Sequence, residues 1–219
     1  VGLDAGAKAV TVKDVTTGEE ETLSYDKLVI AVGASPALPP VKGMELAGVF
    51  TMRKPEDAVS VRAFAQEKGV KKAVVVGAGF IGLEMAENLQ QRGISVTVID
   101  FAPQILPGIL DPEMAAFGKK HLLQKGIRVI TGTKAEEVLG EEGVTAVRTS
   151  AGTLPCSLLI MAAGIRPNTA FLEGSGLKMD RGTIVVDEMM RTNLPDVYAA
   201  GDCALVKSRL TGAPQWSPM

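Results

Sequence analysis

Three glycines near the middle of the chain have the spacing of a phosphate-binding loop. Gly77, Gly79 and Gly82 follow a β-branched apolar run, and a helical pattern begins at Phe80 and Ile81. In such a loop the first glycine allows a tight turn, the second lets the backbone approach a pyrophosphate, and the third lets the helix pack close to the strand. Free N–H groups at the helix N-terminus also favour phosphate. The spacing therefore predicts a dinucleotide site.

An acidic residue follows at the position that a bound ribose would require. A second apolar run, residues 94–99, ends at Asp100, eighteen residues after Gly82. A carboxylate at this place accepts hydrogen bonds from both hydroxyls of the adenosine ribose. A 2′-phosphate would meet like charge there, and residues 101–103 supply no arginine to compensate. We therefore expect NADH to be preferred over NADPH.

The composition argues against several other classes of function. The 219 residues carry a net charge of −2 without a basic stripe, so a nucleic-acid partner is not expected. There is no apolar stretch of membrane-spanning length and no signal-peptide layout, so no membrane association is expected. His121 is the only histidine, and with Cys156 and Cys203 far apart no metal site is expected. This cysteine usage fits a reducing cytoplasm.

The elements that must hold these residues alternate between strands and helices. The strand–helix–strand pattern around the glycines predicts a parallel sheet. Residues 55–68 and 112–125 have helical spacing, each with a proline in the first turn and a glycine after the end. Strand patterns cover further segments: residues 10–25 as a hairpin, 27–32, 127–130, 136–152 as an antiparallel meander, and 158–163. The predicted fold class is α/β, with a Rossmann-like parallel sheet and an antiparallel meander.

Two of the predicted strands repeat one pattern. Residues 28–33 and 159–164 are both apolar runs that end in small residues and a glycine, and a proline follows within three residues. Each is expected to leave its sheet at a tight turn. Their similarity predicts a pair of crossings between two domains.

Three further segments resemble the pyridine nucleotide-disulfide oxidoreductase family. Residues 25–36 resemble the family's YDKLVIATGA-P segment, residues 164–169 its G-x-R-P-N turn, and residues 194–202 its second FAD signature. With the glycine motif, four segments match in the family's order over nearly the whole chain. Arg53 with the residues after it, and the ending at 214–218, are most similar to the NADH oxidase and coenzyme A-disulfide reductase branch.

The resemblance implies an FAD domain that is interrupted by an inserted NAD(P)H domain. Residues 1–50 would end the first half of the FAD domain, residues 51–165 would form the NAD(P)H-binding domain, and residues 166–219 would start the second FAD half. The family's first glycine motif, redox cysteine and dimerisation domain do not lie in this chain. We therefore expect the central fragment of a homodimeric flavoenzyme, inactive alone and poor at holding FAD.

The resemblance also implies roles for single residues. Glu84 would face the nicotinamide, although a solvated helix charge is the alternative. The backbone of Gly164 and Ile165 would touch the nicotinamide end, although Gly164 could serve only as a turn glycine. The FAD contacts would be Gly33, Gly201 and Asp202, the last through a ribityl hydroxyl. The catalytic group stays unknown because neither cysteine matches the family's redox position.

The resemblance implies the cofactors FAD and NAD(H). Hydride would pass from NADH to FAD and on to a disulfide or to oxygen, with the protein mainly placing the reactants. Three alternatives stay open: an NAD(H)-binding module without turnover, electron transfer of the ferredoxin or rubredoxin reductase type, and an inactive flavoprotein that acts as a sensor or scaffold. A flavin absorbance band that bleaches with NADH would distinguish the enzyme from the module.

Overall fold

The computed structural model describes residues 1–218, which fall into two compact units. The inner unit is Pro36–Gly164. The outer unit combines Val1–Ser35 with the residues from Ile165 onward. The inner unit is therefore an insertion between two segments of the outer unit, and each is described by itself.

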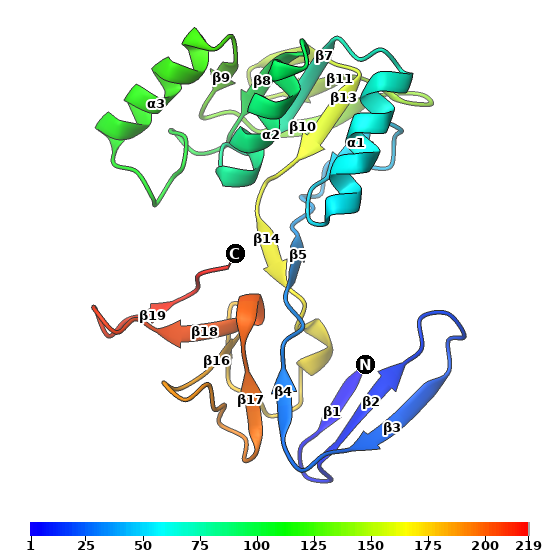
Figure 1. Cartoon of the computed structure of the whole chain (residues 1–219), viewed down its shortest axis with the longest axis vertical. Coiled ribbons are helices and arrows are strands. Elements are labelled where there is room, and N and C mark those ends of the chain that lie inside the picture. The colour runs from blue at the N-terminus through cyan, green and yellow to red at the C-terminus, as the bar shows by residue number, and fades with distance from the viewer. Residues whose placement is uncertain (219) are drawn as a thin grey trace. The chain divides into compact units, whose positions relative to one another are not determined.

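The inner unit is built on a five-stranded parallel sheet in the order β6-β13-β7-β8-β9. Figure 1 labels β13, β7, β8 and β9 of this sheet. The order changes direction at β7, because β8 and β9 follow on one side while β13 and β6 lie on the other. Open α/β sheets bind ligands at such a point, beyond the carboxyl ends of the strands. The strands are β6 (Val49–Thr51), β7 (Lys72–Val76), β8 (Ser95–Ile99), β9 (Arg128–Ile130) and β13 (Leu158–Met161).

Three helices connect these strands: α1 (Pro55–Glu67), α2 (Phe80–Gln91) and α3 (Pro112–Gln124). The predicted starts of α1 and α3 are confirmed, and each helix ends one residue earlier than predicted. Asp57 accepts the backbone N–H groups of Arg53 and Lys54, both at 2.8 Å, before α1. Asp111 caps α3 by accepting the N–H of Met114 at 2.8 Å. Both helices thus begin where local side chains satisfy free N–H groups.

Side chains of the parallel sheet alternate between two cores. Ala73 and Val75 of β7 belong to the core with the three helices, whereas Val74 and Val76 belong to the core with an antiparallel meander. The meander consists of β10 (Ala135–Gly140), β11 (Val144–Thr149) and β12 (Gly152–Pro155). The inner unit is therefore layered as helices, parallel sheet and meander, and the predicted α/β class is confirmed.

The inner unit begins at Pro36, whereas the sequence placed the boundary at residue 51. Residues 36–48 belong to this unit because they pack on the meander. The N–H of Val138 donates to the carbonyl oxygen of Lys42 at 2.9 Å, and a Cβ on Gly43 would overlap the Val138 carbonyl. The short edge strand β6 follows. Its three residues are too few to form a pattern that predicts a strand.

The outer unit contains the predicted N-terminal hairpin, in which β2 (Ala9–Lys13) pairs with β1 (Gly2–Asp4) and β3 (Glu20–Ser24). Strand β4 (Leu28–Ile30) pairs in parallel with β17 (Val197–Ala199). A further sheet holds β15 (Met179–Asp180), β16 (Thr183–Val185), β18 (Ala204–Lys207) and β19 (Pro214–Gln215). The short helices are η1 (Ala170–Leu172) and η2 (Gly201–Cys203).

The chain passes between the units along two strands that pair with each other. Strand β5 (Ala34–Pro36) lies beside β14 (Ile165–Pro167) (Figure 1), so the predicted pair of crossings is confirmed. The preceding strands end earlier than predicted, at Ile30 and Met161. In neither case does the strand extend to the residues just before the turn glycine.

None of the helices within residues 1–218 is both long and apolar enough to span a membrane.

Candidate functional site

A cleft of about 530 Å³ opens at the carboxyl edge of the parallel sheet, within the inner unit. It is lined by segments that follow β7, β8, β9 and β13. Its lining includes the predicted residues Gly77, Gly79, Asp100 and Gly164, together with Lys134. The structure therefore brings these parts of the sequence together at the point where the strand order changes direction.

Gly77 and Gly82 are required by the packing of the chain itself. Gly77 has φ +112°, and a Cβ there would overlap the carbonyl oxygen of Ala162, next to β13. A Cβ on Gly82 would overlap the carbonyl oxygen of Gly77, so its absence lets α2 lie close to the turn. These two glycines perform the turn and packing roles that the motif predicts.

Gly79 has no comparable reason to be glycine. Its φ of −79° and ψ of −176° suit any residue, and a Cβ would meet no other atom within 4 Å. It is the N-cap of α2, and no side chain caps the first N–H groups of that helix. A phosphate lying against this backbone would explain the glycine and use the free N–H groups. The residues present thus fit a dinucleotide pyrophosphate.

Asp100 holds the glycine turn from the end of β8. Its Oδ2 accepts the N–H of Ala78 at 2.5 Å, and its Oδ1 accepts the N–H of Ala102 at 2.7 Å. The carbonyl oxygen of Ala78 in turn accepts the N–H of Leu106 at 2.9 Å. The N–H and the carbonyl of Ala78 are therefore both held by the segment after β8. The sequence does not predict these two contacts.

Leu106, which lines the cleft, has a strained backbone. Its φ of +46° lies in the left-handed region, which costs a non-glycine residue about 1–2 kcal/mol. Strain of this kind concentrates at functional sites, where the surrounding structure enforces it. Here the hydrogen bond to Ala78 links the strained residue to the glycine turn.

Lys134 lines the cleft and adds a positive charge that the sequence pattern does not indicate. Its Nζ lies 4.7 Å from the ring centroid of Phe101, the residue after Asp100. The backbone N–H of Lys134 donates to Ser150 Oγ at 3.1 Å, and the N–H of Ser150 donates back to the Lys134 carbonyl at 3.0 Å. A lysine four residues after the strand pattern at residues 127–130 is a signal in the sequence, but its place beside Phe101 depends on the fold.

Three residues predicted at the dinucleotide do not line the cleft. Phe80, Ile81 and Glu84 lie on exposed positions of α2, and the Glu84 carbonyl accepts Asn88 Nδ2–H at 2.9 Å. Phe80 and Ile81 still provide the first N–H groups of the helix after Gly79. The nicotinamide role of Glu84 stays a prediction.

Gly164 closes the far side of the cleft. It has φ +123°, a Cβ there would meet nothing within 4 Å, and its carbonyl accepts the N–H of Ala37 at 2.9 Å. Ile165, predicted beside it, begins β14 in the outer unit. Gly164 thus leaves open space beside the cleft, and the contacts of Gly164 and Ile165 with the nicotinamide end stay predictions.

The residues predicted to contact FAD lie in the outer unit. Gly33 follows β4, and Gly201 with Asp202 follows β17, which runs parallel to β4. The N–H of Ala200 donates to the Ile30 carbonyl at 3.0 Å, so the two strand ends stay together. Their carboxyl ends meet at one edge, an arrangement that fits a shared ligand.

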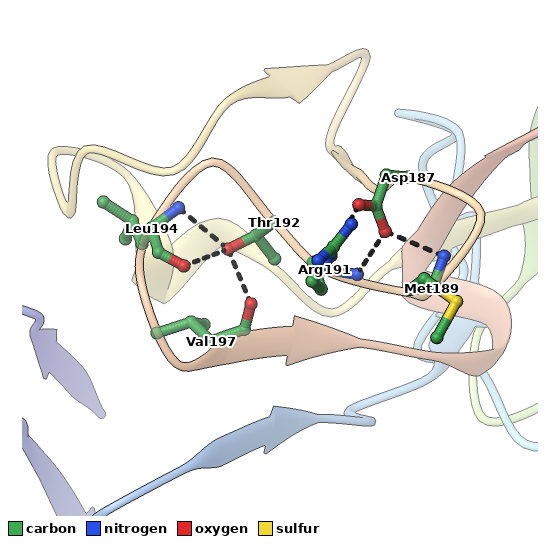
Figure 2. Close-up of polar contacts among 6 residues, drawn as sticks. All are labelled: Asp187, Met189, Arg191, Thr192, Leu194 and Val197. Atoms are coloured by element: carbon green, nitrogen blue, oxygen red, sulfur yellow. Dashed lines mark hydrogen bonds and ion pairs between the residues drawn. The ribbon is translucent and has the colours of Figure 1, made fainter.

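The loop that leads into β17 is held by two polar side chains (Figure 2). Asp187 accepts the N–H groups of Met189 and Arg191 at 2.8 and 2.9 Å, and Nε–H of Arg191 at 2.7 Å. The backbone N–H of Arg191 is the main reason that the pKa of Asp187 lies below its ordinary value. Thr192 donates to the Val197 carbonyl at 2.9 Å. These contacts fix the start of β17.

Neither cysteine has the surroundings of a reactive thiol. Cys156 and Cys203 are free and buried. Burial raises the pKa of Cys156 to about 11, which keeps the thiol protonated. Within residues 1–218 no group of three or more His, Cys, Asp and Glu side chains could hold a metal ion.

The fold and the cleft define a dinucleotide-binding α/β protein with an inserted unit. The chain belongs to the pyridine nucleotide-disulphide oxidoreductase family, whose model matches residues 1–217.

Among curated relatives, it is 42% identical over 217 residues to the NADH oxidase of Methanocaldococcus jannaschii, covering 99% of this chain and 48% of that protein. It is 35% identical to the CoA-dependent NAD(P)H sulfur oxidoreductase of Pyrococcus furiosus, covering 100% of this chain and 51% of the relative. The chain thus spans about half the length of these relatives.

Solved structures match the whole chain. An FAD-dependent pyridine nucleotide-disulphide oxidoreductase from Desulfovibrio vulgaris is 41% identical with a TM-score of 0.86, and this chain covers 56% of it. The water-forming NADH oxidase of Lactobacillus brevis, bound to NADH, is 31% identical with a TM-score of 0.93, and this chain covers 48% of it.

Proposed function

We propose that this chain is the NADH-binding portion of an FAD-dependent oxidoreductase that passes hydride from NADH to FAD and on to a disulfide or to oxygen. The observation that carries the proposal is Gly79, a glycine in the cleft that neither packing nor backbone conformation requires. Membership of the family and the match to an NADH-bound oxidase support it.

Bound NADH supplies the hydride and FAD takes it up, so the residues of this chain bind, orient and shield rather than react. The backbone around Gly79 receives the pyrophosphate on free N–H groups. Asp100 uses its remaining lone pairs for the adenosine ribose hydroxyls, because a carboxylate can accept about four hydrogen bonds and two are in use. Gly164 gives the nicotinamide end room for close approach.

The remaining assignments follow the family resemblance and belong to the same proposal. Glu84 and Ile165 are placed at the nicotinamide. The outer unit contributes FAD contacts through Gly33, Gly201 and Asp202. The inserted inner unit then corresponds to the NAD(P)H domain, and the outer unit to parts of the FAD domain.

The acceptor, the location and the assembly are assigned from different observations. A disulfide or oxygen is the acceptor because the relatives are named as an NADH oxidase and a CoA-dependent sulfur oxidoreductase. The two free cysteines suit a reducing cytoplasm. A homodimer of the whole protein follows from the family resemblance, and light scattering after gel filtration measures it.

The test is a titration of the purified chain with NADH, NADPH and FAD side by side, for the natural sequence and for Gly79→Val. NADH should bind to the natural chain and not to the variant, since the new side chain occupies the place of the pyrophosphate. Gly6→Val is a matched control, because Gly6 lies in the exposed turn between β1 and β2 and its φ is outside the left-handed region. It should bind NADH normally.

The colour of the protein distinguishes an enzyme that transfers hydride from a dinucleotide-binding module. A yellow chain whose flavin band bleaches with NADH supports hydride transfer within this portion. A colourless chain that binds NADH supports a dinucleotide-binding module. NADH binding that survives Gly79→Val would show that the coenzyme lies elsewhere, and the proposal would then fail.

A further inference from the structure

The cleft is lined by a positively charged side chain to which the proposed function gives no role. Among the described residues that line the cleft, Lys134 is the only lysine or arginine. We propose that Lys134 binds the 2′-phosphate of NADPH and so allows the cleft to accept NADPH as well as NADH. This inference rests on the proposed function, because it assumes that the coenzyme occupies this cleft.

The position of Lys134 places its charge on the adenosine side. Its Nζ lies over the ring of Phe101, which directly follows Asp100, the proposed ribose ligand. The glycine turn that would receive the pyrophosphate is a different part of the lining, at Gly77 and Gly79. The phosphate on the ribose 2′-oxygen, which is the one group by which NADPH differs from NADH, would therefore lie on the side of the cleft that holds Lys134.

The side chain is anchored at its base and loosely held at its tip. The backbone of Lys134 exchanges two hydrogen bonds with Ser150, at 3.1 and 3.0 Å, which fixes where the side chain starts. The ammonium rests on the ring of Phe101, a residue that is 69% exposed, and an exposed cation–π contact is weak. A phosphate offers the ammonium a charge-assisted hydrogen bond, which is stronger. The lysine can therefore exchange the ring for the phosphate.

Coenzyme choice then depends on two opposing charges from different strand ends. Asp100, after β8, repels a 2′-phosphate, which carries about two negative charges at neutral pH. Lys134, after β9, attracts it. Phe101 and Pro107, which also line the cleft, carry no charge that would add to either effect. Removing the lysine should therefore leave only the repulsion.

The experiment compares Lys134→Met, which keeps an apolar stem, with Lys134→Arg, which keeps the charge, in the 219-residue chain. Calorimetry measures NADH, NADPH, AMP and adenosine 2′,5′-bisphosphate, so that the extra phosphate is tested without any redox step. Lys134→Met should weaken NADPH and the bisphosphate about tenfold, the value of one charge-assisted hydrogen bond, and change NADH and AMP less than about twofold. Lys134→Arg should restore binding.

Lys120→Met is the control for general charge, since Lys120 is exposed on α3 and does not line the cleft. It should alter all four ligands equally and weakly. In the natural chain, added salt should weaken NADPH more than NADH because it screens the exposed ion contact. Equal losses of NADH and NADPH in Lys134→Met, or no loss of either, would overturn the inference while NADH binding upholds the proposed function. Failure of both coenzymes to bind the natural chain would overturn both.

Discussion

Gly77 and Gly79 allow one substitution, glycine to alanine, to test the fold at one position and the ligand at the other. At Gly77 alanine would adopt φ +112° and its Cβ would overlap the carbonyl of Ala162. Left-handed backbone costs about 1–2 kcal/mol and overpacking about 1–3 kcal/mol. The free energy of unfolding should therefore fall by about 2–5 kcal/mol.

At Gly79 the same change should leave stability nearly unaltered. The backbone conformation suits alanine and the Cβ meets open space. Alanine is a poorer N-cap than glycine, at a cost of up to about 1 kcal/mol, but it also restricts the unfolded chain, which returns about 0.4–1 kcal/mol. The Cβ nevertheless stands between the backbone and the pyrophosphate, so the affinity for NADH should fall at least about tenfold, or ~1.4 kcal/mol.

Thermal melting followed by circular dichroism and an NADH titration measure the two effects. For a chain of this size each kcal/mol moves the melting temperature by roughly 2–4 °C, so Gly77→Ala should melt about 4–20 °C lower. If Gly79→Ala lost as much stability as Gly77→Ala, or bound NADH as the natural chain does, the distinction between a fold glycine and a ligand glycine would be wrong.

Further predictions concern other parts of the chain. Asp100→Ala removes two hydrogen bonds to the backbone and a ribose ligand, so it should weaken NADH more than NADPH; equal losses would remove Asp100 from the ribose role and leave it as a support of the glycine turn. Cys156 and Cys203 should resist a thiol reagent at pH 8 in the folded chain and both react in denaturant, since burial raises the pKa of Cys156 to about 11; rapid labelling of the folded chain would contradict this. The pKa of Asp187 is held below 3.8, chiefly by the backbone N–H of Arg191, so its stabilisation is complete above that pH and is lost as the pH falls through the lower folded value. In acid melting curves Asp187→Asn should lack this loss, and an unchanged acid profile would disprove the assignment.

The features that the sequence predicted correctly depend on neighbouring residues. Helices α1 and α3 begin at the predicted residues, and there Asp57 and Asp111 accept backbone N–H groups within four residues of themselves. The N-terminal hairpin and the β7–α2–β8 unit likewise depend on patterns within about thirty residues, where periodicity and turn chemistry decide the structure. The paired crossings were found because two distant segments repeat the same local pattern.

The features that the sequence did not reveal depend on contacts between distant segments. Residues 36–48 join the inner unit because they pack on a meander that comes nearly a hundred residues later. Lys134 reaches Phe101 only because β8 and β9 are neighbours in the sheet. The preference for NADH that Asp100 and residues 101–103 predict therefore does not include the charge of Lys134.

The glycine motif itself shows why a local pattern is not yet a site. Residues 71–100 contain every residue of the motif, but Gly77 is shaped by close approach to Ala162 beyond β13. The carbonyl of Ala78 is held by Leu106, which also lies outside that segment. A peptide of residues 71–100 would therefore lack two of the contacts that fix the turn, and its N–H groups would have to be ordered at the expense of binding energy. The proposed binding of NADH at this cleft thus depends on the folding of the whole inner unit, because the phosphate-facing backbone takes its shape from the loop after β8 and from the residues after β13.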